Sequence, residues 1–132
     1  MEKLECDYLV IGSGATGMTF VDELIHGSND VKVILVDKRA KPGGHWVDAY
    51  PFVTLHQPAA WYGVNSRALG RGGTDLASKA QILAYYELVM EDLKSTNRLL
   101  YFPQCEYLGD GKFRSLLEEK LEYQVVILSE YY

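Results

Sequence analysis

Residues 7–17 read DYLVIGSGATG, and this stretch decides the fold. Residues 8–11 are a short apolar run of the kind found in strands that are buried on both faces of a sheet. Gly12, Gly14 and Gly17 then complete a G-x-G-x-x-G pattern. From residue 15 to about residue 26, apolar side chains recur every three or four positions, which predicts a helix directly after the glycine turn.

A second apolar run, residues 31–36, ends at Asp37 and completes a strand–helix–strand unit. Such units place their two strands parallel to each other in one sheet. The helical pattern puts Asp22 and Glu23 on the face directed to water and Gly27 at the C-terminal end of the helix. We therefore expect an α/β fold built on a parallel sheet.

The rest of the chain adds one long segment, one helix and several short strands. Residues 38–73 are irregular and rich in glycine, proline and aromatic residues, and so long a segment within a compact domain is usually functional. Ser78 and Gln81 have the spacing of a capping box, which predicts a helix over residues 78–95. A third strand and an antiparallel meander are expected over residues 99–128. We expect one domain over residues 1–132.

The spacing of the glycines and of one acidic residue predicts a dinucleotide-binding turn. Asp37 stands twenty residues after Gly17, at the end of the second strand, as in dinucleotide fingerprints. Gly12 permits the tight turn, Gly14 lets the backbone approach a pyrophosphate, and Gly17 lets the helix pack closely on the strand. The helix N-terminus presents N–H groups to the phosphates, and Asp37 would accept hydrogen bonds from a ribose. The alternative is a glycine-rich turn that binds nothing.

The residues after Asp37 leave two dinucleotides open. Lys38 and Arg39 are suited to contact a 2′-phosphate, which would indicate NADP. Residues 41–46, KPGGHW, bring a second glycine pair and a broad aromatic side chain. Flavoproteins place a loop here along the riboflavin half of FAD, whereas NAD-binding domains usually continue into a helix.

Three stretches resemble the FAD-binding domain of the two-dinucleotide flavoproteins, which include pyridine-nucleotide oxidoreductases and flavin-containing monooxygenases. They are DYLVIGSGATG, VILVDKR with GGHW, and YPFVTLHQPAAWYGVNSRALG at residues 50–70, the last being similar to a microbial set of FAD/NAD(P)-binding oxidoreductases. The similarity continues through CEYLGDGKFRSL and covers nearly the whole chain. It implies an α/β fold with a partial Rossmann-like, FAD/NAD(P)-binding parallel sheet and a small antiparallel β-meander.

The resemblance also implies a set of cofactor contacts. The fingerprint glycines and Asp37 map to the pyrophosphate and ribose of FAD, and residues 43–46 map beside the ribityl chain and the isoalloxazine. His56 and Gln57 are candidates to line the flavin face or a substrate pocket, a buried structural histidine being the alternative. The candidate cofactor-binding residues are Gly12, Gly14, Ala15, Thr16, Gly17, Asp37, Lys38, Arg39, Gly43, Gly44, His45, Trp46, His56 and Gln57. The expected cofactor is FAD, with NAD(P) as an external reductant, and we assign neither catalytic residues nor metal ligands.

The chain is much shorter than members of that group. It lacks their second glycine fingerprint, which binds NAD(P)H, and their later Gly-Asp element, since Gly109 and Asp110 fall in a predicted hairpin turn. Without later strands, the strand at residues 8–11 would expose an edge. We therefore expect a shortened FAD-binding domain that forms a homodimer or docks on a larger partner protein to complete its sheet. A compact monomer is the alternative.

Three functional interpretations remain open at this point. One is a flavin-dependent oxidoreductase of the monooxygenase-like type that lacks its own NAD(P)H domain. A second is a non-catalytic remnant that acts as a nucleotide-binding or protein-interaction module. The third is the N-terminal fragment of a longer flavoprotein.

The composition excludes several other classes of protein. The 132 residues are 48% hydrophobic and 23% charged, as in ordinary globular domains. The net charge of −5 disfavours binding to nucleic acid or to anionic lipid, and no apolar run is long enough to span a membrane. Cys6 and Cys105 lack the spacing of a metal or redox motif. With no recognisable presequence, we expect reduced, buried thiols in a cytoplasmic protein.

Overall fold

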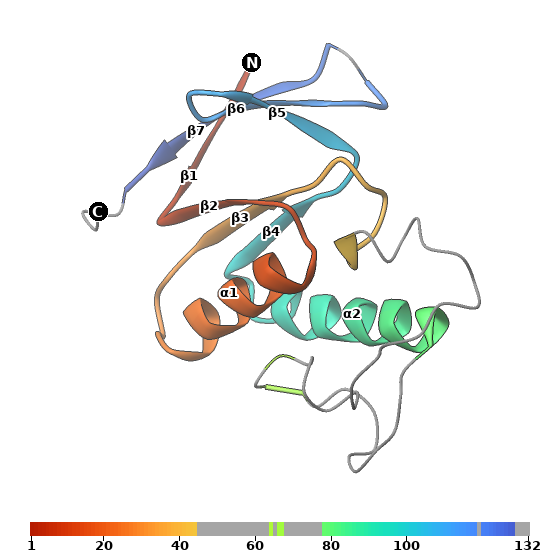
Figure 1. The fold of residues 1–132 in the computed structure, drawn as a ribbon. Coiled ribbons are helices and arrows are strands. Elements are labelled where there is room, and N and C mark those ends of the chain that lie inside the picture. Colours follow the sequence, from red (N-terminus) through yellow and green to blue (C-terminus); the bar gives the residue numbers. More distant parts are fainter. Residues whose placement is uncertain (45–63, 65, 68–77, 119, 129–132) are drawn as a thin grey trace.

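The computed structural model describes residues 1–44, 64, 66–67, 78–118 and 120–128 (Figure 1). Its elements are β1 (Glu2–Cys6), β2 (Tyr8–Ile11), α1 (Ala15–His26), β3 (Val33–Val36), α2 (Lys79–Lys94), β4 (Leu99–Phe102), β5 (Cys105–Gly109), β6 (Lys112–Ser115) and β7 (Glu122–Ile127). The βαβ unit over residues 7–37, the second helix, the third strand and the hairpin are where the sequence predicts them. Most of the expected loop over residues 38–73 lies outside the described residues.

The strands form two sheets. β2, β3 and β4 make a parallel sheet in the order β2-β3-β4. The second sheet has the order β1-β7-β6-β5, in which β5, β6 and β7 are the antiparallel meander and β1 runs parallel to β7. The expected combination of a partial Rossmann-like parallel sheet with a small β-meander is confirmed.

The N-terminal strand β1 was not predicted from the sequence. We expected the first strand at residues 8–11, but an earlier segment pairs with β7, from Glu2 opposite Tyr123 to Cys6 opposite Ile127. Of the β1 side chains, only that of Cys6 is fully buried, because β1 lies at the edge of its sheet. An edge strand with charged side chains lacks the apolar run by which buried strands are recognised.

The parallel sheet lies between the two helices and the second sheet (Figure 1). Along β3, alternate side chains point to opposite faces. Val33 and Leu35 pack into the core formed with α1 and α2. The core on the other face is made of Cys6, Ile34, Val36, Cys105, Phe113 and Val125. Because β3 is buried on both faces, it reads as the continuous apolar run seen in the sequence.

The helix α2 begins with the expected capping box. The Ser78 hydroxyl accepts a hydrogen bond from the Gln81 backbone N–H at 3.2 Å, and the Ser78 N–H donates to Gln81 Oε1 at 2.7 Å. Satisfying two helix-end N–H groups in this way fixes where the helix starts. No helix in the part of the chain that the structure describes is long and apolar enough to cross a membrane.

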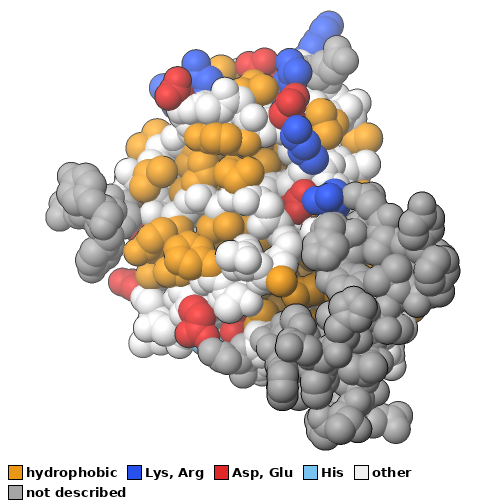
Figure 2. All heavy atoms as spheres, viewed as in Figure 1, with side chains coloured by type: hydrophobic (Ala, Val, Ile, Leu, Met, Phe, Trp, Pro, Cys, Tyr) orange, Lys and Arg blue, Asp and Glu red, His pale blue; other side chains and the backbone are white. Residues whose placement is uncertain are grey.

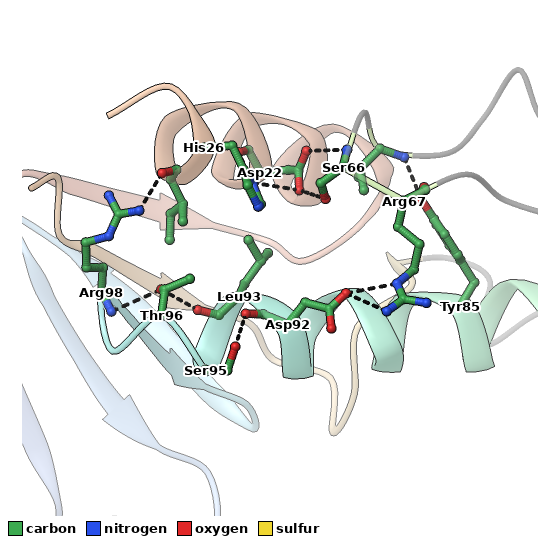
Figure 3. A network of polar contacts seen from close by, with 12 residues as sticks. Asp22, His26, Ser66, Arg67, Tyr85, Asp92, Leu93, Ser95, Thr96 and Arg98 are labelled. Carbon is green, nitrogen blue, oxygen red and sulfur yellow. Dashed lines mark hydrogen bonds and ion pairs between the residues drawn. The ribbon is translucent and has the colours of Figure 1, made fainter. Parts of the chain in front are cut away.

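The expectation that Asp22 faces water is wrong. Asp22 is only 1% exposed, and its carboxylate accepts hydrogen bonds from the Ser66 hydroxyl and, at 3.2 Å, from the Ser66 N–H (Figure 3). Helical periodicity places Asp22 beside the apolar stripe but carries no information about a partner 44 residues away. A buried carboxylate needs such donors to remain ionised at acceptable cost.

Candidate functional site

The glycine-rich turn joins β2 to α1 and folds closely on itself. Gly12 has a φ of +101°, a conformation that side chains other than glycine rarely adopt. Its N–H donates to the Val36 carbonyl oxygen at 2.8 Å, which extends the pairing of β2 with β3. A Cβ atom on Gly17 would lie 2.0 Å from the Gly12 carbonyl oxygen. Only glycine at position 17 therefore lets α1 begin so close to β2.

The N-terminus of α1 is arranged to receive an anion. Gly14 is the N-cap residue and caps the helix with no side-chain hydrogen bond, and the first turn contains no acidic residue. The N–H groups of a first helical turn have no partner within the helix. Together with the positive end of the helix dipole, they attract phosphate groups.

The second glycine pair packs on this turn. The Gly43 N–H donates to the Ser13 carbonyl oxygen at 2.9 Å. A Cβ atom on Gly44 would lie 2.8 Å from the Gly14 Cα atom, and one on Gly14 would lie 3.4 Å from the Gly44 Cα atom. The two backbones thus meet where a side chain on Gly44 would force them apart. We call residues 12–17 with Gly43 and Gly44 the glycine cradle.

Asp37 fastens the cradle to the end of β3. Its Oδ2 atom accepts hydrogen bonds from the Ser13 N–H at 2.7 Å and from the Ser13 hydroxyl at 2.5 Å. Its Oδ1 atom accepts one from the Arg39 N–H at 2.9 Å. A carboxylate offers about four lone-pair directions, so Oδ1 retains one direction for a further donor such as a ribose hydroxyl.

A cleft of about 340 Å³ opens beside Asp37 at the carboxyl ends of β2 and β3. Open α/β sheets bind their ligands at this end of the parallel strands. The lining residues are Ile11, Gly12, Val36, Asp37, Lys38 and Arg39, together with Cys105 and Tyr107 from β5. Sequence reasoning missed Cys105 and Tyr107, because only the folding of the meander brings β5 to the cradle. It also missed Ile11, which is the last residue of β2.

The two basic residues after Asp37 also line the cleft. The Lys38 ammonium lies 3.9 Å from the Glu106 carboxylate, which the Arg114 guanidinium contacts at 3.1 Å. An acidic neighbour reduces the attraction of Lys38 for a 2′-phosphate. The Lys38 side chain is largely exposed, so its own ion pair adds little stability.

The structure therefore brings together the candidate residues that it describes. The fingerprint glycines, Gly43, Gly44, Asp37 and the two basic residues all border one turn and one cleft. His45, Trp46, His56 and Gln57 lie outside the described residues, and their assignment to the flavin stays a prediction.

A second polar cluster, formed by Asp22, His26 and Ser66, has the residue types of a catalytic triad but a different geometry (Figure 3). The His26 Nδ1 atom lies 3.3 Å from the Asp22 carboxylate. The Ser66 hydroxyl donates to Asp22 instead of to the histidine. A nucleophilic serine must give its proton to a base such as histidine, so the cluster does not activate Ser66.

The cluster instead ties Val64, Ser66 and Arg67 to both helices (Figure 3). The Val64 N–H donates to the Tyr85 hydroxyl at 2.7 Å, and that hydroxyl donates to the Arg67 carbonyl oxygen. The Arg67 guanidinium contacts the Asp92 carboxylate at 2.9 Å. Asp22 on α1 and Tyr85 on α2 thus fix the same short segment, which is a structural role.

Both cysteines are free and buried, as expected. Burial raises the pKa of the Cys6 thiol to about 11 and also raises the pKa of Cys105. Since the thiolate is the reactive form, a raised pKa keeps both side chains unreactive near neutral pH.

Comparison with known proteins agrees with this geometry. Residues 10–65 match the NAD(P)-binding Rossmann-like domain family. An uncharacterised protein of Mycobacterium tuberculosis is 52% identical over 126 residues, which cover 87% of this chain and 23% of that protein. A ferredoxin–NADP reductase of Mesorhizobium japonicum is 27% identical over 128 residues, covering 96% of this chain and 33% of the reductase. The chain thus spans about a quarter to a third of the length of these relatives.

Solved structures share the fold. A flavin-containing monooxygenase from Stenotrophomonas maltophilia superposes with a TM-score of 0.67 at 19% identity, over 95% of this chain and 37% of the enzyme. A bacillithiol disulfide reductase from Bacillus cereus gives a TM-score of 0.71 at 16% identity, over 92% of this chain and 38% of the reductase. The parallel sheet, α1 and the glycine cradle have the arrangement of a Rossmann-like fold. More narrowly, the chain shares its fold with these flavoprotein oxidoreductases, and residues 10–65 match the model of the NAD(P)-binding Rossmann-like domain family.

Proposed function

We propose that the chain binds FAD as the nucleotide-binding part of a flavin-dependent oxidoreductase of the monooxygenase-like type. The contact of Gly43 and Gly44 with the fingerprint turn carries this proposal. It sets a second glycine-rich backbone directly against the N-terminus of α1. A turn that only connected a strand to a helix would have no need of this second backbone.

The described residues fit a dinucleotide. The backbone N–H groups of the first turn of α1, including those of Ala15 and Thr16, would hold the pyrophosphate. The free direction at Asp37 Oδ1 would accept a ribose hydroxyl. Bound flavin supplies the redox chemistry, while the protein binds and orients it.

We expect NAD(P)H as a reductant from outside this chain. The relative from Mesorhizobium japonicum is a ferredoxin–NADP reductase, and the chain covers only 33% of its length. The free thiols of Cys6 and Cys105 suit a reducing compartment, and we propose the cytoplasm.

A titration of the purified protein with FAD, followed by flavin fluorescence, tests the proposal. Binding should saturate, and Gly44→Val should abolish it because the side chain would force Gly44 away from Gly14. Leu88→Ala, at an exposed position on α2 that does not line the cleft, is the control and should bind as the unchanged protein does. A folded protein that leaves the fluorescence of FAD unaltered would refute FAD binding.

The FAD-loaded protein then distinguishes an enzyme from a binding module. Loss of the visible flavin absorption on anaerobic addition of NADPH, with recovery on admission of oxygen, supports an oxidoreductase. Stable absorption after addition of NADPH supports a nucleotide-binding role without turnover.

A second candidate function, protein interaction, is favoured by the outer edge of β2. The N–H groups of Tyr8 and Gly12 donate to β3. Because successive N–H groups of a strand point to opposite sides, those of Leu9 and Ile11 point to the outer edge. Among the described residues, no strand pairs with that edge. β2 is therefore able to accept another strand.

Apolar side chains surround this edge. Figure 2 shows hydrophobic bands over the region of β1, β2 and α1. The exposed large hydrophobic residues on β2, on α1 and at the end of β7 are Ile11, Phe20, Val126, Ile127 and Leu128. Apolar surface next to an open strand edge is typical of an interface.

We propose that a second copy of the chain covers this edge. In a solution of the purified protein, the open edge of β2 on another copy is the strand edge available for pairing. Two copies related by a two-fold axis would pair β2 with β2 antiparallel. Light scattering on a sizing column should report a dimer. Ile11→Pro should give a monomer, because it removes an outward N–H at a half-exposed residue and spares the bonds to β3. A monomeric unchanged protein would leave a larger partner protein as the occupant and refute the dimer.

A further inference from the structure

The Tyr101 hydroxyl is a buried polar group that has no hydrogen-bond partner among the residues that the structure describes. Tyr101 lies on β4, opposite Leu35 of β3, and both side chains pack into the core formed with α1 and α2. Buried polar groups in native proteins are nearly always paired, because an unpaired donor loses its hydrogen bonds to water without compensation. An unpaired hydroxyl needs a physical reason, either a water molecule, stored strain or a function.

The phenol of Tyr101 lies beside the buried pair of Ser13 and Asp37. Burial raises the pKa of Tyr101 to about 12, the Ser13 side chain opposes this rise, and the Asp37 carboxylate adds to it. Both neighbours are thus close to the phenol, yet neither forms a hydrogen bond of acceptable geometry with it. The Ser13 hydroxyl donates its proton to Asp37 Oδ2, but a hydroxyl oxygen also has lone pairs that accept hydrogen bonds. Ser13 is therefore an acceptor next to the unpaired Tyr101 proton.

A cavity of about 210 Å³ also borders Tyr101. Its lining includes Pro42, from the segment that follows β3, and Met90 on α2. The Tyr101 hydroxyl oxygen is itself closed to solvent, so water in this cavity does not supply the missing partner. Protein interiors are otherwise close-packed, and this space lets the ring shift slightly without a clash.

We infer that Tyr101 is a positioning residue of the cradle, whose hydroxyl donates to the Ser13 hydroxyl oxygen when a nucleotide is bound. The inference rests on the proposed function, because it takes the pyrophosphate to bind at the N-terminus of α1. Ser13 directly precedes Gly14, the N-cap residue of that helix. A phosphate held by the N–H groups of the first turn orders the backbone next to Ser13. Hydrogen bonds that are misaligned before a ligand binds commonly tighten in the complex.

This role gives the Tyr101 hydroxyl two opposite effects. Without nucleotide, the unpaired hydroxyl costs free energy. With nucleotide, the same hydroxyl is paired through Ser13 to Asp37, so part of the affinity comes from the relief of that cost. Tyr101→Phe removes the hydroxyl and keeps the ring. It should therefore stabilise the protein without nucleotide and weaken nucleotide binding, whereas a side chain that only filled space would leave the affinity unchanged.

Thermal unfolding without nucleotide and dissociation constants for FAD and ADP test this prediction. In Tyr101→Phe the unfolding midpoint should rise by about 3 °C or more, and both ligands should bind about 5- to 100-fold more weakly. Tyr85→Phe is the matched control, because the Tyr85 hydroxyl accepts from the Val64 N–H and donates to the Arg67 carbonyl oxygen. This control should lower the midpoint and keep both dissociation constants within about twofold.

The Ser13→Ala background shows whether Tyr101 acts through Ser13. Without the Ser13 hydroxyl oxygen, the Tyr101 hydroxyl loses its acceptor in the complex. Adding Tyr101→Phe to Ser13→Ala should therefore change the dissociation constants by less than about twofold. A further loss of about fivefold or more in this background would mean that Tyr101 acts by another route, and would overturn the inference.

The outcomes separate this inference from the proposed function. If the unchanged protein binds FAD and ADP, and Tyr101→Phe binds both equally well, Tyr101 is not a positioning residue and FAD binding stands. A lower unfolding midpoint in Tyr101→Phe would show that the hydroxyl is already paired without nucleotide, which also overturns the inference. If the unchanged protein binds neither ligand, both proposals fail.

Discussion

Ser13 donates two hydrogen bonds to one carboxylate oxygen of Asp37, from its backbone N–H at 2.7 Å and from its hydroxyl at 2.5 Å. Ser13 belongs to the glycine turn, and Asp37 directly follows β3. Both residues are buried. Asp37 thus holds the turn in shape independently of any nucleotide, and the same carboxylate keeps one direction for a ribose.

Asp37→Ala should lower the free energy of unfolding in the absence of nucleotide. Two buried donors of Ser13 would lose their acceptor, which costs about 2–4 kcal/mol. Ser13→Ala, which removes only the hydroxyl, should cost about 1 kcal/mol. Urea unfolding measures both. Unchanged stability in Asp37→Ala would show that Asp37 does not support the turn.

Gly17→Ala should destabilise the protein much more than Gly14→Ala. The new Cβ atom would lie 2.0 Å from the Gly12 carbonyl oxygen in the first case and 3.4 Å from the Gly44 Cα atom in the second. We expect a loss of about 3 kcal/mol or more for Gly17→Ala and less than about 1 kcal/mol for Gly14→Ala. Thermal unfolding compares them, and equal losses would contradict the packing of α1 against β2.

Asp22→Ala should destabilise the protein by about 2–3 kcal/mol, because the Ser66 N–H and hydroxyl lose a buried acceptor. Glu91→Ala, at an exposed acidic residue on α2, is the control and should cost less than about 0.5 kcal/mol. Denaturant midpoints of the two variants give the comparison. Similar midpoints would mean that Asp22 is replaceable by water.

Stability should fall in alkaline solution from about pH 9 upward. The pKa of the Cys6 thiol is raised by burial from its ordinary value of 9.0 to about 11. Between these pH values the unfolded chain releases a proton that the folded chain retains, so unfolding becomes easier as pH rises. The fall due to Cys6 should reach about 2–3 kcal/mol and level off above its folded pKa.

The Cys6→Ala variant isolates this effect. Between about pH 9 and pH 11, the stability of this variant should decline less than that of the unchanged protein. The two declines should differ by the amount due to Cys6, about 2–3 kcal/mol. The pKa of Tyr86 and of Tyr101 is raised by burial to about 12, so a further decline above about pH 10 should persist in both proteins. Identical pH profiles would contradict a buried Cys6 thiol.

Much of the fold could be predicted because its central strands and helices carry local patterns. The bounds of α1 and β4 follow from the periodicity and from the flanking glycine and proline, and the capping box locates α2. β1 could not be found in this way. Its pairing with β7 joins the two ends of the chain, and no local pattern encodes a contact at that distance.

The candidate site likewise contains some residues that local sequence patterns identify and others that only distant contacts bring into place. The fingerprint motif identifies the glycines and Asp37, because each has a local conformational role. The contact between Gly14 and Gly44, the burial of Asp22 and the position of Tyr107 at the cleft depend on segments that meet only in the folded chain. Their residue types are ordinary in the sequence, so only the structure reveals them.

Co-elution of FAD with the protein tests nucleotide binding by the cradle most directly. The protein is incubated with excess FAD and passed through a sizing column, and the visible spectrum of the protein peak is recorded. Bound flavin in a ratio near one per chain, absent in Gly44→Val, is the expected result. Folded protein that elutes without flavin absorption would contradict the assignment of the cradle and of Asp37 to the cofactor.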